Sequence, residues 1–159
     1  MLKRNSQSEI EITNQDLNIS IRPYIDGEDE GIRCIIQNMI FQSKSREMLT
    51  VDDIFTDTFQ DYYIKDMSYF ICINDIPIGF GQIIFSEDIY TLVNFGIIPE
   101  FRGHKLSKVL LNEIILSCKE KGIKLITLKV DTKNEQAISL YSKAGFNKKY
   151  NVSSFNRLN

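Results

Sequence analysis

The stretch Ile97-Ile98-Pro99-Glu100-Phe101-Arg102-Gly103-His104-Lys105-Leu106-Ser107 decides the fold of this sequence. Apolar residues from 89 to 98 predict a strand, and Pro99 ends it because proline has no backbone N–H for a sheet. Apolar residues at helical spacing predict a long helix that begins near Leu106. The first N–H groups of such a helix lack intrahelical partners and carry partial positive charge, and Gly103 lets a ligand approach the backbone. The turn is therefore typical of a site for an anion such as a pyrophosphate, although an ordinary capped connection explains it equally well.

Outward from this stretch, the chain alternates between strand and helix patterns. Strands are expected at 17–22, 68–74, 76–85, 89–98 and 124–130, with short ones at 146–150 and 152–155. Helices are expected over a segment with Ile32, Ile35, Ile36 and Met39 on its apolar face, over 45–60, from 106 to Gly122, and over a segment with Ala137, Leu140, Tyr141 and Ala144 on its apolar face. This order predicts an α+β fold, in which helices flank a mixed, mostly antiparallel central sheet. Residues 17–159 are expected to form a single domain, and 1–16 a polar N-terminal arm that is partly disordered.

Composition narrows the class of protein. The chain has 159 residues, of which 43% are hydrophobic and 25% charged, and its net charge of -2 argues against a nucleic-acid partner. No apolar run is long enough to cross a membrane and the polar start lacks a signal peptide, so a cytoplasmic location is expected. The cysteines Cys34, Cys72 and Cys118 lie in apolar runs without metal-ligand spacing, and there is one histidine. We expect buried thiols and no metal site.

Two stretches carry a resemblance to a known family. The turn 97–107, followed by Val109-Leu110-Leu111, resembles the coenzyme A signature of the GCN5-related N-acetyltransferase (GNAT) family, Arg/Gln-x-x-Gly-x-Gly/Ala. The stretch 134–146 is similar to the family's Asn-x-x-Ala-x-x-Leu-Tyr-x-x-x-Gly-Phe. Lys105 and Ser107 occupy positions where the signature usually has glycine and glycine or alanine. The resemblance covers residue 17 to the C-terminus and implies a GNAT-like acyl-CoA N-acyltransferase fold.

The resemblance also implies a cosubstrate and roles for individual residues. Acetyl-CoA would donate its acetyl group to a primary amine, and the amine nitrogen would attack the thioester directly. The backbone of Ile97 and Ile98 would bind the pantetheine arm, with Asn134 beside it, and Tyr141 would act as general acid on the leaving thiolate. From local chemistry alone, Asn134 is equally a helix N-cap and Tyr141 a core residue. The N–H groups that would hold the pyrophosphate belong to Arg102, Gly103, His104, Lys105, Leu106 and Ser107.

The acceptor half of the site is less defined. Relatives often carry a carboxylate on the strand before the signature, but 91–96 contains none. Asn94 on that strand and Glu87 in the preceding turn are the candidates on the substrate side. The acceptor is expected to be a small-molecule or peptide amine, and a homodimer stays open. Two alternatives remain, a coenzyme A-binding regulatory module with little catalysis and a scaffold that has kept the fold without the ligand.

Overall fold

The computed structural model describes residues 18–43, 45–149 and 154–159. The predicted arm at 1–16, and 150–153 of the predicted terminal strands, lie outside these residues. The helices are α1 (Glu30–Ile40), α2 (Val51–Thr58), α3 (Leu106–Glu120) and α4 (Glu135–Lys143), with a 3-10 turn η1 (Pro99–Phe101). The strands are β1 (Ile19–Pro23), β2 (Tyr63–Ile73), β3 (Ile76–Ser86), β4 (Ile89–Ile97), β5 (Leu125–Lys129), β6 (Asn147–Lys148) and β7 (Ser154–Leu158).

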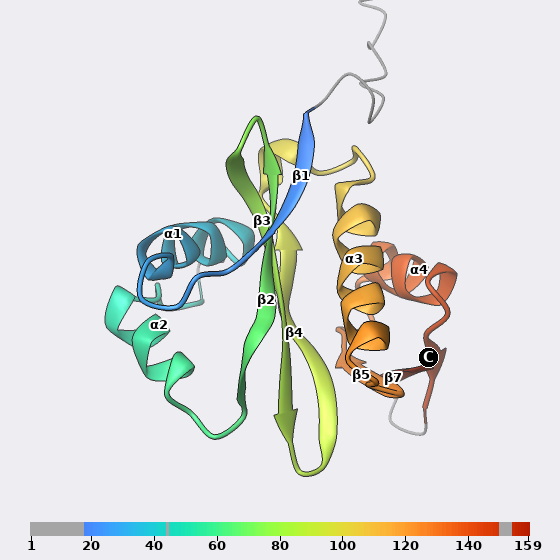
Figure 1. Ribbon diagram of the computed structural model, residues 1–159. Coiled ribbons are helices and arrows are strands. Elements are labelled where there is room, and N and C mark those ends of the chain that lie inside the picture. The colour runs from blue at the N-terminus through green and yellow to red at the C-terminus, as the bar shows by residue number, and fades with distance from the viewer. Residues whose placement is uncertain (1–17, 44, 150–153) are drawn as a thin grey trace, which may run out of the picture.

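The strands form one seven-stranded sheet in the order β1-β2-β3-β4-β5-β7-β6. Every neighbouring pair is antiparallel except β4 and β5, which are parallel because α3 provides the crossover between them. Helices α1 and α2 lie on one side of the sheet, and α3 and α4 on the other (Figure 1). The predicted α+β class, with a mostly antiparallel sheet flanked by helices, is confirmed.

Several element boundaries differ from the sequence prediction, and two of the differences are the largest. The helix expected over 45–60 begins only at Val51, where Thr50 and Asp53 form a capping box. The strand expected at 68–74 begins earlier, at Tyr63. No helix among the described residues is long and apolar enough to cross a membrane. The three cysteines are buried and free, as predicted.

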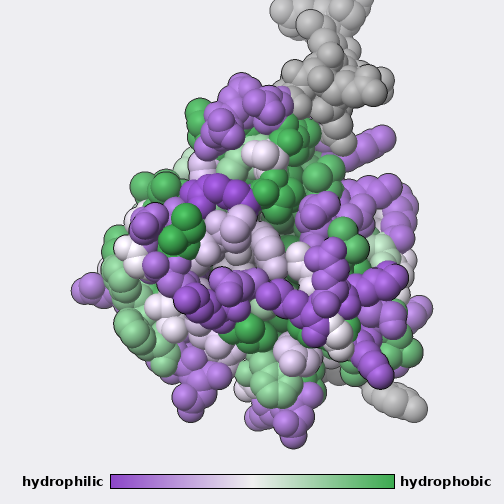
Figure 2. All heavy atoms as spheres, in the orientation of Figure 1, coloured by the Kyte–Doolittle hydropathy of each residue, from purple (hydrophilic) through white to green (hydrophobic). Residues whose placement is uncertain are grey.

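Helix α1 buries only part of the face that its apolar residues predict. Ile36 is buried, but Ile32 and Ile35 are 39% and 61% exposed. The polar side chains of Arg33 and Gln37 are buried in their place: Arg33 donates to Gln37 within α1 and to Asp57 of α2. Hydrophobic surface is correspondingly visible over the side of the molecule that α1 and α2 cover (Figure 2).

Candidate active site

The site begins where β4 separates from β5. The two strands pair only from Tyr90 to Leu92 with Ile126 to Leu128. Past Leu92, the pairing of β4 with β3 shifts register, and Asn94 adopts a φ of +53°, which makes a β-bulge. The bulge bends β4, so among the described residues 93–97 pair with β3 alone. The edge of β4 that would face β5 is thus open.

The backbone of Ile97 faces this open edge. The Ile98 N–H donates to the Ile78 carbonyl at 2.9 Å, and backbone groups alternate sides along a strand. The N–H and C=O of Ile97 therefore point away from β3. Of the two residues predicted to bind pantetheine through the backbone, Ile97 offers its N–H to the open edge, whereas the Ile98 N–H is used inside the sheet.

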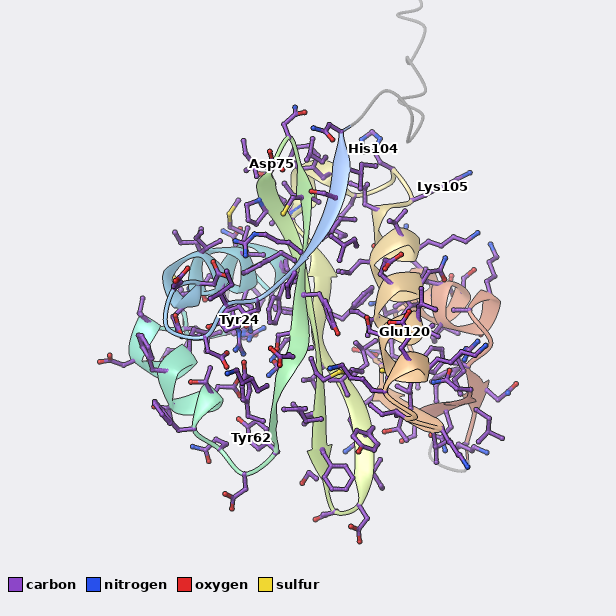
Figure 3. The ribbon with its side chains drawn as sticks, viewed as in Figure 1. Tyr24, Tyr62, Asp75, His104, Lys105 and Glu120 are labelled. Atoms are coloured by element: carbon purple, nitrogen blue, oxygen red, sulfur yellow. The ribbon has the colours of Figure 1, made fainter. Side chains whose placement is uncertain are left out.

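The predicted phosphate turn connects β4 to α3. Gly103 has a φ of +87° and Lys105 a φ of +60°, so both lie in the left-handed region, which favours glycine. Lys105 is the N-cap residue of α3, and no side chain caps the first turn. His104 and Lys105 lie at the start of α3 (Figure 3). The first N–H groups of α3, from Leu106 and Ser107, are thus presented at the end of the open edge.

Arg102 holds this turn in place. Its Nε donates to the Ile97 carbonyl at 3.0 Å and its Nη2 donates to the Ile40 carbonyl at 2.8 Å, at the end of α1. Its backbone N–H donates to the Pro99 carbonyl. The side chain therefore ties β4, the turn and α1 together, and the N–H groups that remain for a pyrophosphate are those after Arg102.

Helix α4 belongs to the second predicted stretch and brings Tyr141 against β4. Asn134 is the N-cap of α4, since its Oδ1 accepts from the Ala137 N–H at 3.1 Å, which confirms the capping interpretation. Tyr141 is buried, and its ring centroid lies 6.1 Å from that of Phe95 and 5.8 Å from that of Phe146. Phe95 directly follows the bulge, so Tyr141 packs against β4 where it leaves β5.

The surroundings of Tyr141 keep its hydroxyl protonated. Burial raises the pKa of the Tyr141 phenol to about 12. Within the described part of the chain, the hydroxyl makes no hydrogen bond. Tyr141 is therefore a neutral phenol at physiological pH, and it can donate a hydrogen bond to a ligand atom.

Adjacent residues of β4 face opposite sides of the sheet. A Cβ on Gly96 would lie 2.4 Å from Ile40 of α1, so glycine allows α1 to approach the strand. Phe95 lies with Ile114 of α3 on the other side, since a Cβ on Gly81 would meet both. Asn94 is on the same side as α1, because its Nδ2 donates to Gln82 Oε1 at 3.0 Å. The bulge thus directs Asn94 toward α1 and α2, and Phe95 toward Tyr141.

Glu87 does not join the other predicted residues. It lies in the exposed β3–β4 turn, with a φ of +52°, before the first residue of β4. A strand rises about 3.3 Å per residue, so Glu87 is roughly 20 Å along the chain from Asn94. The structure brings Asn94, Ile97, the turn at 103–107 and Tyr141 to the open edge of β4 and its end, and leaves Glu87 at the far end of the strand.

Three polar residues that sequence reasoning missed lie behind Asn94. Arg33, Asp57 and Gln82 are joined by hydrogen bonds, and Gln82 contacts Asn94. Burial raises the pKa of the Asp57 carboxyl, but the hydrogen bonds from Tyr62, Arg33 and Gln82 outweigh it, and the net pKa is lowered. The available signal in the sequence was a glutamine inside the otherwise apolar strand 76–85.

Comparison with known proteins identifies the class. Residues 37–146 match the model of the acetyltransferase (GNAT) family, so the chain belongs to this family. It is 39% identical over 74 residues to the ribosomal protein bS18-alanine N-acetyltransferase of Haemophilus influenzae, over 46% of this chain and 50% of that protein. The chain spans about half the length of the curated relatives it matches.

Solved structures share the fold. The ribosomal-protein-S18-alanine N-acetyltransferase from Escherichia coli superposes with a TM-score of 0.68 at 19% identity, covering 87% of this chain and 90% of that one. The PaiA N-acetyltransferase from Thermoplasma acidophilum, solved in complex with coenzyme A, gives a TM-score of 0.70 at 21% identity, covering 89% and 99%. At these identities the likeness establishes the fold.

Proposed function

We propose that this protein is an acetyl-CoA-dependent N-acetyltransferase that transfers the acetyl group to a primary amine by direct attack. The observation that carries the proposal is the open edge of β4 at 93–97, which leads directly to the uncapped start of α3. The amide groups of a pantetheine arm pair with such an edge as an added strand does. The α3 N-terminus supplies N–H groups and partial positive charge for the pyrophosphate.

The proposal assigns a role to each residue predicted to bind the cofactor. The Ile97 backbone binds pantetheine, and the pyrophosphate lies against the backbone of Gly103, His104, Lys105, Leu106 and Ser107. Asn134, which caps α4, is proposed to lie beside the arm as well. The chemistry requires no metal ion, and among the described residues no group of three His, Cys, Asp or Glu side chains is arranged to hold one.

The transfer itself forms one bond and breaks another. The amine nitrogen attacks the thioester carbonyl carbon, a C–N bond forms, the C–S bond breaks and coenzyme A leaves as a thiolate, while the amine proton passes to solvent. Tyr141 stabilises the departing sulfur. A thiol has a pKa of roughly 8.5, well below the value of about 12 for Tyr141. Full proton transfer from the phenol is therefore uphill, and we assign Tyr141 a hydrogen bond to the sulfur.

The acceptor belongs to the amine class, either a small molecule or a peptide. The name of the Haemophilus influenzae relative gives alanine of ribosomal protein bS18 as its acceptor. A peptide with a free N-terminal alanine is therefore the first acceptor to test here. We place the reaction in the cytoplasm without a nucleic-acid or membrane partner, and a homodimer remains to be tested by its mass in solution.

Two measurements test the proposal. Calorimetry with acetyl-CoA should give saturable binding, and thiol release should depend on an added amine from a panel that includes the alanine peptide. Binding without thiol release for any amine would support the alternative, a coenzyme A-binding regulatory module, which the lack of a carboxylate on β4 favours. Absence of binding would contradict both and favour a scaffold without ligand.

Tyr141→Phe tests the role of the hydroxyl. The ring contacts with Phe95 and Phe146 persist, so acetyl-CoA should bind with unchanged affinity. Loss of the hydrogen bond to the sulfur should lower kcat by about tenfold to a hundredfold. Stopped thiol-release assays at saturating amine measure this, and Tyr90→Phe on β4 is the matched control. Unchanged turnover in Tyr141→Phe would show that the phenol has no part in the chemistry.

A further inference from the structure

A chain of buried hydrogen bonds runs from α1 and α2 to the bulge of β4. Arg33 is 1% exposed, and its Nη2 donates to Asp57 Oδ2 at 2.5 Å and to Gln82 Oε1 at 3.2 Å. Gln82 is fully buried and donates from Nε2 to Asp57 Oδ2 at 3.2 Å. Gln82 Oε1 also accepts from Asn94 Nδ2 at 3.0 Å. Tyr62, which donates to Asp57, lies on the same side of the sheet (Figure 3).

The charged groups of Arg33 and Asp57 fix which way the side-chain amides of Gln82 and Asn94 point. A guanidinium only donates hydrogen bonds, and an ionised carboxylate only accepts them. Gln82 must therefore turn Oε1 toward Arg33 and Nε2 toward Asp57. Since Asn94 meets the oxygen of Gln82, it must present its nitrogen there. An isolated asparagine has two nearly equivalent orientations of its amide, whereas here the ion pair selects one.

The fixed amide orientation leaves the Oδ1 of Asn94 available at the bulge. With Nδ2 bound to Gln82, the Oδ1 of Asn94 accepts no hydrogen bond within the described part of the chain. Asn94 is half-buried and directly precedes Phe95, which contacts Tyr141. The hydrogen-bond acceptor of Asn94 and the phenol of Tyr141 thus approach the same short segment of β4 from opposite sides of the sheet.

We propose that Gln82 is a positioning residue that, held by Arg33 and Asp57, orients Asn94 so that Oδ1 accepts a hydrogen bond from the N–H of the attacking primary amine. The inference rests on the proposed N-acetyl transfer. A neutral carbonyl oxygen in this place binds the amine and directs its lone pair without removing the proton. This explains how the chain works without a carboxylate on β4.

Gln82→Met tests the proposal because methionine fills similar volume and makes no directed hydrogen bond. Loss of one orienting hydrogen bond should raise KM for the amine about tenfold, measured with an alanine-terminated peptide and with butylamine. KM for acetyl-CoA should stay unchanged, because Gln82 does not lie at the open edge. Equal increases in both constants would indicate general damage and overturn the proposal.

Gln37→Met is the matched control. Gln37 is also a buried glutamine bonded to Arg33, since its Oε1 accepts from Nε at 2.6 Å, but it does not contact Asn94. Its substitution should change KM for the amine by less than about twofold, because it leaves the Gln82–Asn94 contact in place. A similar rise in both variants would assign the effect to packing around Arg33 and refute the positioning role.

Asn94→Asp is a further test, because the proposal predicts a loss of activity where the addition of a base would predict a gain. A carboxylate at this position resembles the base that relatives carry, and would raise activity if a base were lacking. Here it would place an acceptor oxygen against the oxygen of Gln82, so we expect a loss of about tenfold in kcat/KM for the amine. A gain in activity would overturn the proposal.

A readout that needs no turnover separates this inference from the proposed function. The side-chain amide protons of Asn94, assigned by NMR from their loss in Asn94→Asp, should be protected from exchange in the wild type and in Gln37→Met. They should lose protection in Gln82→Met, and unchanged protection would refute the orientation. A wild-type protein that binds acetyl-CoA but acetylates no amine would overturn the proposed function and the role of Asn94 in binding the amine. The NMR result would still decide whether Gln82 orients the Asn94 amide.

Discussion

Lys105 adopts a φ of +60° directly before α3, in a position where the family signature usually has glycine. A left-handed conformation costs a residue with a Cβ about 1–2 kcal/mol. Two residues earlier, Gly103 meets the same backbone requirement without this cost. The glycine that the signature usually has at the position of Lys105 is thus explained by backbone conformation, and Lys105 retains strain that a glycine would relieve.

Lys105→Gly should therefore stabilise the protein. Relief of the left-handed strain outweighs the extra entropy of the unfolded glycine chain, and the net gain should be about 0.5–1 kcal/mol in free energy of unfolding. Urea denaturation measures it. Lys108→Gly, in the first helical turn and also exposed, is the control and should lose about 1 kcal/mol, because its backbone is helical. Destabilisation by both substitutions would show that Lys105 is not strained.

At the scale of elements, α1 shows what periodicity can and cannot predict. The helix was predictable from Ile32, Ile35, Ile36 and Met39, but the face that it buries was predictable only in part. Arg33 is buried because its partners Asp57 and Gln82 come from other elements, 24 and 49 residues along the chain. A pattern within one helix carries no information about such partners, so apolar periodicity was right for Ile36 and Met39 and wrong for Ile32 and Ile35.

Strand β4 shows the same limit for the site. The strand, the turn after Pro99 and the two family stretches were predictable, because each depends on neighbouring residues. The bulge at Asn94 was not, since it arises from the register with β3. Because the bulge decides which side chains meet the acceptor and which meet Tyr141, the cofactor half of the site was easier to predict than the acceptor half.

The ion pair between α1 and α2 should be important for stability. Asp57→Ala would leave the buried guanidinium of Arg33 without its carboxylate, and removal of one partner from a buried pair costs about 3–5 kcal/mol. Asp52→Ala, on an exposed position of the same helix, should cost less than about 1 kcal/mol. Chemical denaturation of both variants measures the difference. Equal small losses would mean that the guanidinium finds other partners.

At the scale of the whole molecule, the α1–α2 side holds the polar chain behind Asn94, and the α3–α4 side holds the aromatic surroundings of Tyr141. Burial raises the pKa of the phenols of Tyr24, Tyr63, Tyr69 and Tyr141 and of the Cys118 thiol, the last to about 11. Both layers therefore favour the neutral forms of groups that ionise only in alkaline solution, so the folded state should be sensitive to high pH.

The alkaline limb of stability gives the last prediction. Below pH 9 a buried phenol is protonated in both the folded and the unfolded state, so its contribution to the free energy of unfolding does not change with pH. Between about pH 10, where an unfolded tyrosine ionises, and about 12, where Tyr141 ionises in the fold, only the unfolded state loses its proton. Each such phenol then lowers the free energy of unfolding by about 1.4 kcal/mol per pH unit.

Urea titrations of wild type and Tyr141→Phe at several pH values isolate one phenol: the stability of the wild type relative to the variant should be constant up to pH 9 and fall above pH 10. A difference that does not change with pH would show that the Tyr141 hydroxyl is not buried in its neutral form.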